Sequence, residues 1–302
     1  MRSRKLLALL LIAVGVSVAF VVTILASRQA EPTYKGRPLA HWARRASGIQ
    51  TQEDAEEARA AIFALCTNRI IDLANALDYD PIPRAKRWGS RLSWLPTARQ
   101  RDLLYYAFPD RRGNEAQNAA TALRVLGPSA APAIPILSNL LFASNEFVAS
   151  RSAWVLLTMG TNGFPPLVRA LADDGYPWRV AVLYHLDRSE LTNNQGAPFV
   201  PCLLHATADP DAEAALAAIQ ILGGWTIQPD EAMPVLTRVL TNNDSRLRYE
   251  AVRALARFGL AAKPAARPVR ELFQDPDFGV RFAATNAFAL ITAESATNTP
   301  AR

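Results

Sequence analysis

The sequence contains few of the residues that build catalytic and metal centres. Two cysteines and three histidines occur among its 302 residues. Cys66 and Cys202 lie far apart and have apolar neighbours, so we expect two buried free thiols instead of a disulfide. None of His41, His185 and His205 belongs to a recognisable metal-ligand motif. We therefore predict no metal site and no cofactor, and we expect each histidine to be structural or at the surface.

The sequence also lacks the local motifs of common enzyme classes. It has no glycine-rich phosphate-binding loop and no Gly-x-Ser-x-Gly nucleophile motif. No Cys/His pair has local support in the sequence. We therefore expect a protein that is not an enzyme, and we name no catalytic residue.

A basic face of the kind that binds nucleic acid is missing as well. The formal net charge is +6. Four basic residues, Arg2, Arg4, Lys5 and Arg28, lie in the first 30 positions, which contain no acidic residue. Residues 31–302 carry 29 basic and 27 acidic side chains, so most of the excess belongs to the N-terminal segment. We expect no nucleic-acid partner.

One long hydrophobic run is present, from Leu6 to Ala26, and it follows a short basic head at residues 1–5. As a helix it would be about 30 Å long, enough to cross the hydrocarbon core of a bilayer. It is longer than the apolar region of an ordinary signal peptide and lacks a small-x-small end. We predict a single-pass anchor in the cytoplasmic membrane, with the rest of the chain outside the cytoplasm. The alternative is secretion after cleavage of a signal peptide, and basic residues on both flanks leave the sidedness open.

The rest of the chain is dominated by an internal repeat between residues 114 and 292. Each copy has an Ala/Leu-rich helical run, a break with glycine or proline, and a second short apolar run; five copies are followed by half of a sixth. Gly127 and Gly160 end two of the first runs 33 residues apart, and Gly223 and Gly259 follow two later ones. A period in this range predicts a stacked array of helix pairs. Prolines at the breaks are expected to start the second helices.

Two repeat starts have the same arrangement of charged residues. Asp244 precedes Arg248 and Asp275 precedes Arg281, and the two arginines are 33 residues apart. These starts and the period resemble the HEAT-repeat family, including the lyase-type HEAT-like repeats. The resemblance implies an all-α fold, a right-handed α-solenoid of stacked helix pairs, here preceded by one transmembrane helix.

The segment before the repeats is predicted to hold a polar linker at residues 27–38 and then, across 39–113, a capping helix, a degenerate repeat and a basic, aromatic loop. The spacing of Tyr34, Gly36, Leu39 and Trp42 is similar to that of membrane-anchored bacterial HEAT proteins of uncharacterised role. We interpret Trp42 as part of the capping helix, with a peptide-binding aromatic as the alternative. Residues 293–302 are predicted to be a disordered tail.

The basic, aromatic loop is the one local patch that could contact an anion, a lipid headgroup or single-stranded nucleic acid. Its candidate contact residues are Arg84, Lys86, Arg87, Trp88, Arg91 and Trp94. The simpler alternative is a solvated insert whose aromatic side chains pack on a neighbouring repeat.

The sequence therefore favours a membrane-anchored, non-catalytic scaffold that binds a protein or peptide, with the bilayer as its second partner through Leu6 to Ala26. A lyase-type HEAT-like enzyme or accessory factor is the alternative. An anion or nucleic-acid binder acting through residues 84–112 is the third reading. Fold motifs alone do not choose the ligand.

Overall fold

The computed structural model describes residues 32–48, 51–80, 110–189, 191 and 193–293. The basic head, the predicted anchor from Leu6 to Ala26, the six candidate contact residues at positions 84–94 and nearly all of the predicted tail lie outside this part. The chain forms two compact units, Met1–Leu65 and Cys66–Arg302, each described below by itself.

Within its described residues, the first unit contains a short hairpin and two helices. Strands β1 (Thr33–Tyr34) and β2 (Arg37–Pro38) pair antiparallel and are followed by α2 (Leu39–Ser47) and α3 (Gln52–Cys66). The two turn residues between the strands, Lys35 and Gly36, both have positive φ, as a two-residue hairpin turn requires. The predicted linker therefore contains a small sheet that sequence periodicity did not indicate.

Trp42 joins this hairpin to α2. Its indole N–H donates to the carbonyl oxygens of Tyr34 and Arg37, both at 3.3 Å, and its ring meets the Tyr34 ring edge to face. The Trp42 side chain is buried. The spacing of Tyr34, Gly36, Leu39 and Trp42 thus has a structural role, and Trp42 is not an exposed peptide-binding aromatic.

The second unit is a solenoid-like array of helix pairs. Its elements, in chain order, are η1 (Thr67–Arg69), α4 (Ile70–Ala76), α7 (Arg111–Leu126), η2 (Gly127–Ala133), α8 (Ile134–Leu141), α9 (Glu146–Thr158), η3 (Gly160–Asn162), α10 (Phe164–Ala172), α11 (Arg179–Asp187), α12 (Asn193–Gly196), η4 (Ala197–Phe199), α13 (Val200–Ala206), α14 (Ala212–Trp225), α15 (Pro229–Val239), α16 (Ser245–Phe258), η5 (Gly259–Ala265), α17 (Ala266–Glu271), η6 (Leu272–Gln274) and α18 (Phe278–Thr292).

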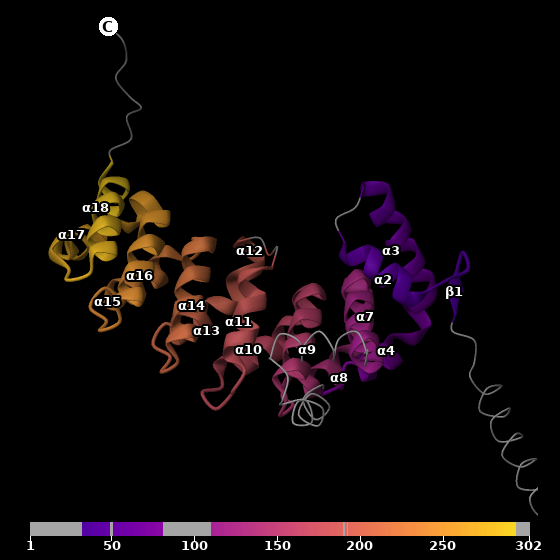
Figure 1. The fold of residues 1–302 in the computed structure, drawn as a ribbon. Helices are drawn as coiled ribbons and strands as arrows, with labels where there is room; N and C mark the ends of the chain where they lie inside the picture. Colours follow the sequence, from indigo (N-terminus) through magenta and orange to yellow (C-terminus); the bar gives the residue numbers. More distant parts are fainter. Residues whose placement is uncertain (1–31, 49–50, 81–109, 190, 192, 294–302) are drawn as a thin grey trace, which may run out of the picture. The chain divides into compact units, whose positions relative to one another are not determined.

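The first helices of the pairs, α7, α9, α11, α14, α16 and α18, pack on one another in sequence order. The second helices α8, α10, α13, α15 and α17 each pack on the first helix of the following pair (Figure 1). Within the described residues this gives five pairs and a final single helix, which confirms the predicted stacking of helix pairs.

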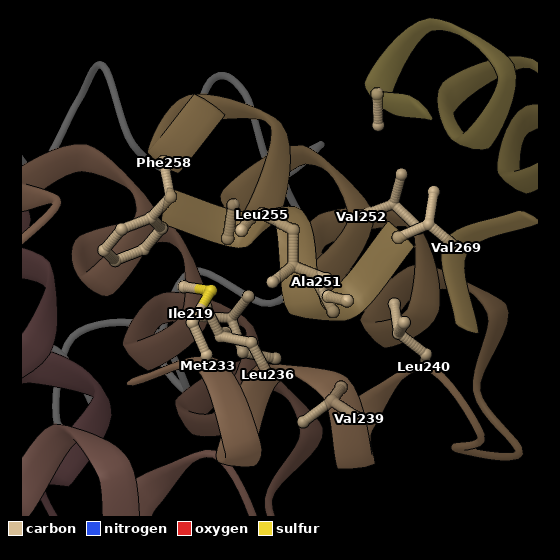
Figure 2. Packing of buried hydrophobic residues seen from close by; sticks show 14 of the residues in the cluster. Ile219, Met233, Leu236, Val239, Leu240, Ala251, Val252, Leu255, Phe258 and Val269 are labelled. Carbon is tan, nitrogen blue, oxygen red and sulfur yellow. The ribbon is translucent and has the colours of Figure 1, made fainter. Parts of the chain in front are cut away.

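Buried apolar side chains from consecutive pairs form a shared core. Figure 2 shows α16 with Ala251, Leu255 and Phe258 directed toward Met233 and Ile219 of the preceding pair. On the other side of the same helix Val252 lies near Val269 of α17 (Figure 2). Each pair therefore buries its apolar face on its neighbours, as a repeat array requires.

Glycine and proline mark several repeat boundaries as predicted. Gly127, Gly160 and Gly259 have φ of 53°, 64° and 55° at the ends of first helices, a conformation that favours glycine. Pro135 lies in the first turn of α8, where its missing N–H costs nothing. Pro234 is different: α15 already begins at Pro229, so Pro234 lies inside the helix.

The prediction that Gly223 ends a helix is wrong. Helix α14 continues through it to Trp225. A Cβ atom at Gly223 would lie 2.7 Å from both the Cα and the Cβ atoms of Ala254 in α16. The glycine therefore permits a close approach of two first helices, which is a tertiary requirement and not a capping one.

The Asp and Arg residues of the repeat starts link adjacent pairs. Arg248 donates from Nε and Nη2 to the two carboxylate oxygens of Asp275, each at 2.8 Å, and Arg179 contacts Asp209 at 2.7 Å. All four side chains are largely buried. Each of the two arginines also donates to a backbone carbonyl six residues earlier, in the turn before its helix. Arg281 makes the same backbone hydrogen bond at the equivalent position. The sequence motif is thus a clamp between repeats.

Both cysteines are free and buried, as predicted. Burial raises the pKa of the Cys66 thiol to about 11 and also raises the pKa of Cys202. At neutral pH both groups are protonated, so neither supplies a reactive thiolate.

In the described part of the chain, the stretch Arg111–Leu141 is long and apolar enough to cross a membrane by length and composition. Half of its most apolar window is buried inside the protein. It comprises α7, η2 and α8, whose Leu123 and Leu137 belong to the core of the array. The high hydropathy of this stretch is explained by the packing of this helix pair within the array.

Candidate functional site

A groove of about 790 Å³ lies across three consecutive first helices of the second unit, α7, α9 and α11. Arg124 contributes from α7 and Trp154 from α9, while Tyr184 and His185 come from α11 and Arg188 follows that helix. Among the described residues its lining includes three arginines and neither aspartate nor glutamate. The groove therefore combines positive charge with aromatic surface.

A row of stacked side chains crosses the groove. The guanidinium carbon of Arg124 lies 3.7 Å from the centroid of the Trp154 ring. The same ring is stacked on His185, with centroids 6.0 Å apart and planes 20° apart. Because the aromatic face attracts the cation and the two rings stack, the three side chains hold one another in place across three repeats.

A second cation–aromatic pair lies beside this row. The Arg188 guanidinium carbon is 3.9 Å from the centroid of the Tyr184 ring. Tyr184 in turn meets the His185 ring edge to face, with centroids 5.4 Å apart. Both Tyr184 and Arg188 are exposed, so this side of the groove is accessible to a ligand.

His185 is held neutral by its surroundings. Burial and, to a lesser extent, the positive charges of Arg124 and Arg188 together lower its pKa to about 4. Its Nε2 atom lies 2.8 Å from the hydroxyl oxygen of Ser150. Burial also lowers the pKa of Arg124, whose Nε has no hydrogen-bond partner among the described residues.

The Ser150–His185 pair has the distance of a nucleophile and its base, but its surroundings oppose that chemistry. A general base must accept a proton and become an imidazolium. Two arginines and partial burial disfavour that cation, and no carboxylate is hydrogen-bonded to His185 among the described residues. A catalytic triad supplies such a carboxylate. The arrangement is suited to binding.

The described residues also contain no group of three or more His, Cys, Asp or Glu side chains that could hold a metal ion. His205 contacts Asp174 at 2.9 Å, and both side chains are exposed. His41 packs edge to face on Trp42.

Comparison with known proteins identifies one segment of the array. Residues 200–290 match the family model of HEAT repeats. The match spans α13 to α17 and most of α18. The groove lies outside it, on helix pairs that precede the matched segment.

No curated protein matches the chain. Among solved structures, a designed armadillo repeat protein in complex with the peptide (KR)4 is 16% identical, with a TM-score of 0.44 and coverage of 74% of this chain and 99% of that one. The complex of CpcE and CpcF of phycocyanin lyase from Nostoc sp. PCC7120 is 19% identical, with a TM-score of 0.31 and coverage of 87% and 97%. At these scores neither structure bears on the ligand or activity of the HEAT-like array.

Sequence reasoning did not predict this groove. The six candidate contact residues of the loop lie outside the described residues, and the groove uses side chains from three other segments. The repeat period contained one signal. Tyr184 lies five residues after the clamp arginine Arg179, and Arg253 lies five residues after the clamp arginine Arg248, so the two side chains occupy equivalent positions on their helices. Aligning the first helices on their clamp positions would have placed Trp154 and Tyr184 in one row.

Proposed function

We propose that this protein is a membrane-tethered, HEAT-like scaffold that binds a segment of another protein in the groove across α7, α9 and α11. The observation that carries this proposal is the row formed by Arg124, Trp154 and His185 across three successive repeats. A rigid, open surface with aromatic anchors and cationic groups is typical of protein recognition. The neutral histidine, to which no described carboxylate is hydrogen-bonded, disfavours an enzyme.

The tether in this proposal is the uncharged run from Leu6 to Ala26, with the array outside the cytoplasm. We expect the full-length chain to stay in the membrane fraction after an alkaline carbonate wash, and its N-terminus to begin at or near Met1. Mass spectrometry of the intact protein measures the second point. A chain recovered in the soluble fraction and beginning after residue 26 would show instead that the run is a cleaved signal peptide.

Photo-crosslinking tests the groove. A photoreactive phenylalanine analogue in place of Tyr184, in cells that express the full-length chain, is expected to give a discrete adduct with another protein. The same analogue at Leu260, which is 49% exposed and lies in η5, serves as the matched control. Replacing Trp154 with alanine in the Tyr184 background should weaken the adduct severalfold.

The proposal fails if both positions give the same adducts, or if Tyr184 gives none while the protein is folded and expressed at the normal level. If the adduct persists at full strength after Trp154→Ala, the partner contacts Tyr184 from outside the groove.

A further inference from the structure

From the groove's charge and geometry we infer that the bound segment is acidic, with a carboxylate held between Arg124 and Arg188. This inference rests on the proposed function and adds the chemical class of the ligand. It concerns the two arginines whose guanidinium groups stack on Trp154 and Tyr184.

The first argument is that these two charges have no acidic partner among the described residues. Elsewhere in the array, arginines such as Arg179, Arg248 and Arg253 pair with aspartate or glutamate at 2.7–3.0 Å. Neither Arg124 nor Arg188 forms an ion pair with a described residue. Arg124 is partly buried, so its guanidinium without a counter-charge carries a desolvation cost that a bound anion would offset, while the exposed Arg188 is accessible to the same anion.

Arg151, the third arginine of the groove, is different because the fold already uses it. Its Nε donates to the carbonyl oxygen of Phe147 at 3.1 Å, and its Nη2 donates to the carbonyl oxygen of Tyr79. It therefore contributes positive potential to the groove, while Arg124 and Arg188 remain for a ligand.

The second argument is geometric. A guanidinium that lies flat on an aromatic ring keeps its N–H edge directed away from the ring, and that edge is the part that binds a carboxylate with two parallel hydrogen bonds. Trp154 and Tyr184 hold the two guanidinium groups over their rings, at 3.7 and 3.9 Å from the ring centroids, before any ligand arrives. Such preorganisation lowers the entropic cost of binding. Leu157 and Leu191, also in the lining, offer apolar contacts to residues beside the carboxylate.

A peptide fits these features better than nucleic acid does. Binding to a nucleic-acid backbone depends on many phosphate contacts along its length. The groove offers two arginines that form no ion pair with a described residue, and residues 31–302 have nearly balanced charge, with 29 basic and 27 acidic side chains. A single acidic side chain beside apolar ones matches the two arginines and the leucines.

His185 reports on occupancy of the site. The groups that face or contact it come from three helices and are Arg124, Ser150, Trp154, Tyr184 and Arg188. Because the two arginines depress its pKa, a carboxylate bound between them should raise that pKa above its free value of about 4. By linkage, the acidic ligand should bind more tightly as pH falls through the range where the bound histidine becomes protonated and the carboxylate is still ionised.

The experiment uses the full-length chain in mild detergent and three pools of decapeptides. Glutamate, glutamine or lysine alternates with randomised residues in the respective pools. We expect the wild type to retain the glutamate pool preferentially. The exposed substitution Arg188→Gln should weaken retention about tenfold, the effect of losing one charge-assisted contact. Arg124→Gln should do the same, whereas Arg253→Gln on α16 should leave retention unchanged.

A second readout is the pKa of His185, followed by NMR titration with and without the glutamate pool. An upward shift of the His185 pKa on binding, absent in Arg188→Gln, supports the inference. Retention of the peptides without that pKa shift would show that they bind elsewhere, and it would overturn the inference. If the wild type instead prefers the glutamine or lysine pool, and Trp154→Ala abolishes that retention, the inference of an acidic ligand is wrong but the proposed function stands. Displacement of the bound pool by single-stranded RNA or DNA at equal concentration favours nucleic acid and also overturns it. If no pool is retained, the inference is wrong. The proposed function is tested separately by the photo-crosslinking at Tyr184.

Discussion

Replacing Asp275 with alanine is expected to lower the free energy of unfolding of the C-terminal repeats by about 3–5 kcal/mol, the usual cost of breaking a buried ion pair. The Asp275 side chain is 3% exposed and accepts two hydrogen bonds from Arg248. It also accepts from the backbone N–H of Asp277 at 2.8 Å. The substitution removes the carboxylate that links α16 to the start of α18 and leaves the Arg248 charge unpaired.

Hydrogen exchange of the full-length protein measures this effect locally, and urea unfolding measures it for the whole array. Protection should fall most in α16 and α18, because each repeat contacts only its neighbours. The matched control is Glu213→Ala, which breaks another ion pair between repeats, Glu213–Arg246 at 2.8 Å, whose two side chains are more than half exposed. An exposed pair contributes at most about 1 kcal/mol. Equal losses in the two variants would contradict the proposed role of burial.

The same ion pair makes a prediction about pH. The hydrogen bonds from Arg248 lower the pKa of Asp275 below its ordinary value. A group whose pKa is lower in the folded state stabilises the protein above its unfolded pKa, about 4, and loses that contribution as pH falls through its folded pKa. The stability difference between wild type and Asp275→Ala should therefore be constant at neutral pH and shrink below about pH 4.

Replacing Gly223 with alanine is expected to destabilise the array by about 1–3 kcal/mol, although alanine is the better helix former by about 1 kcal/mol. The added Cβ would lie 2.7 Å from the Cα and Cβ atoms of Ala254, and a backbone atom cannot move aside as a side-chain tip can. Helices α14 and α16 would have to separate, and their shared core would lose contact.

The next residue supplies the control. Gly224 also lies inside α14, and a Cβ there would have no heavy atom within 4 Å. Gly224→Ala should therefore stabilise the protein by about 0.5–1 kcal/mol through helix propensity alone. Thermal unfolding of the two single variants separates the explanations, because a pair of capping glycines would be damaged by both substitutions. A neutral or stabilising Gly223→Ala would refute the close approach.

Local patterns in the sequence were sufficient where the physical cause is local. The period near 33 residues predicted the helix pairs because each pair must bury one apolar stripe. Gly127, Gly160 and Gly259 were recognised as helix ends because their left-handed backbone conformation favours glycine whatever surrounds them. The burial of Cys66 and Cys202 followed from their apolar neighbours.

The features that the sequence missed depend on residues brought together from different repeats. Gly223 has the same sequence context as a capping glycine, and its role is set by Ala254 on another helix. The clamp arginines were visible as a motif, but Asp275 became the partner of Arg248 through the stacking of one pair on the next. In the same way, no local pattern joins Arg124 to Trp154.

The sequence by itself determined that this chain forms helix pairs at a fixed period, since backbone conformation and apolar periodicity are properties of short segments. The tertiary structure alone decided where the proposed binding groove lies. Arg124, Trp154 and Tyr184 lie about 30 residues apart along the chain, and only the stacking of α7, α9 and α11 brings them to one groove.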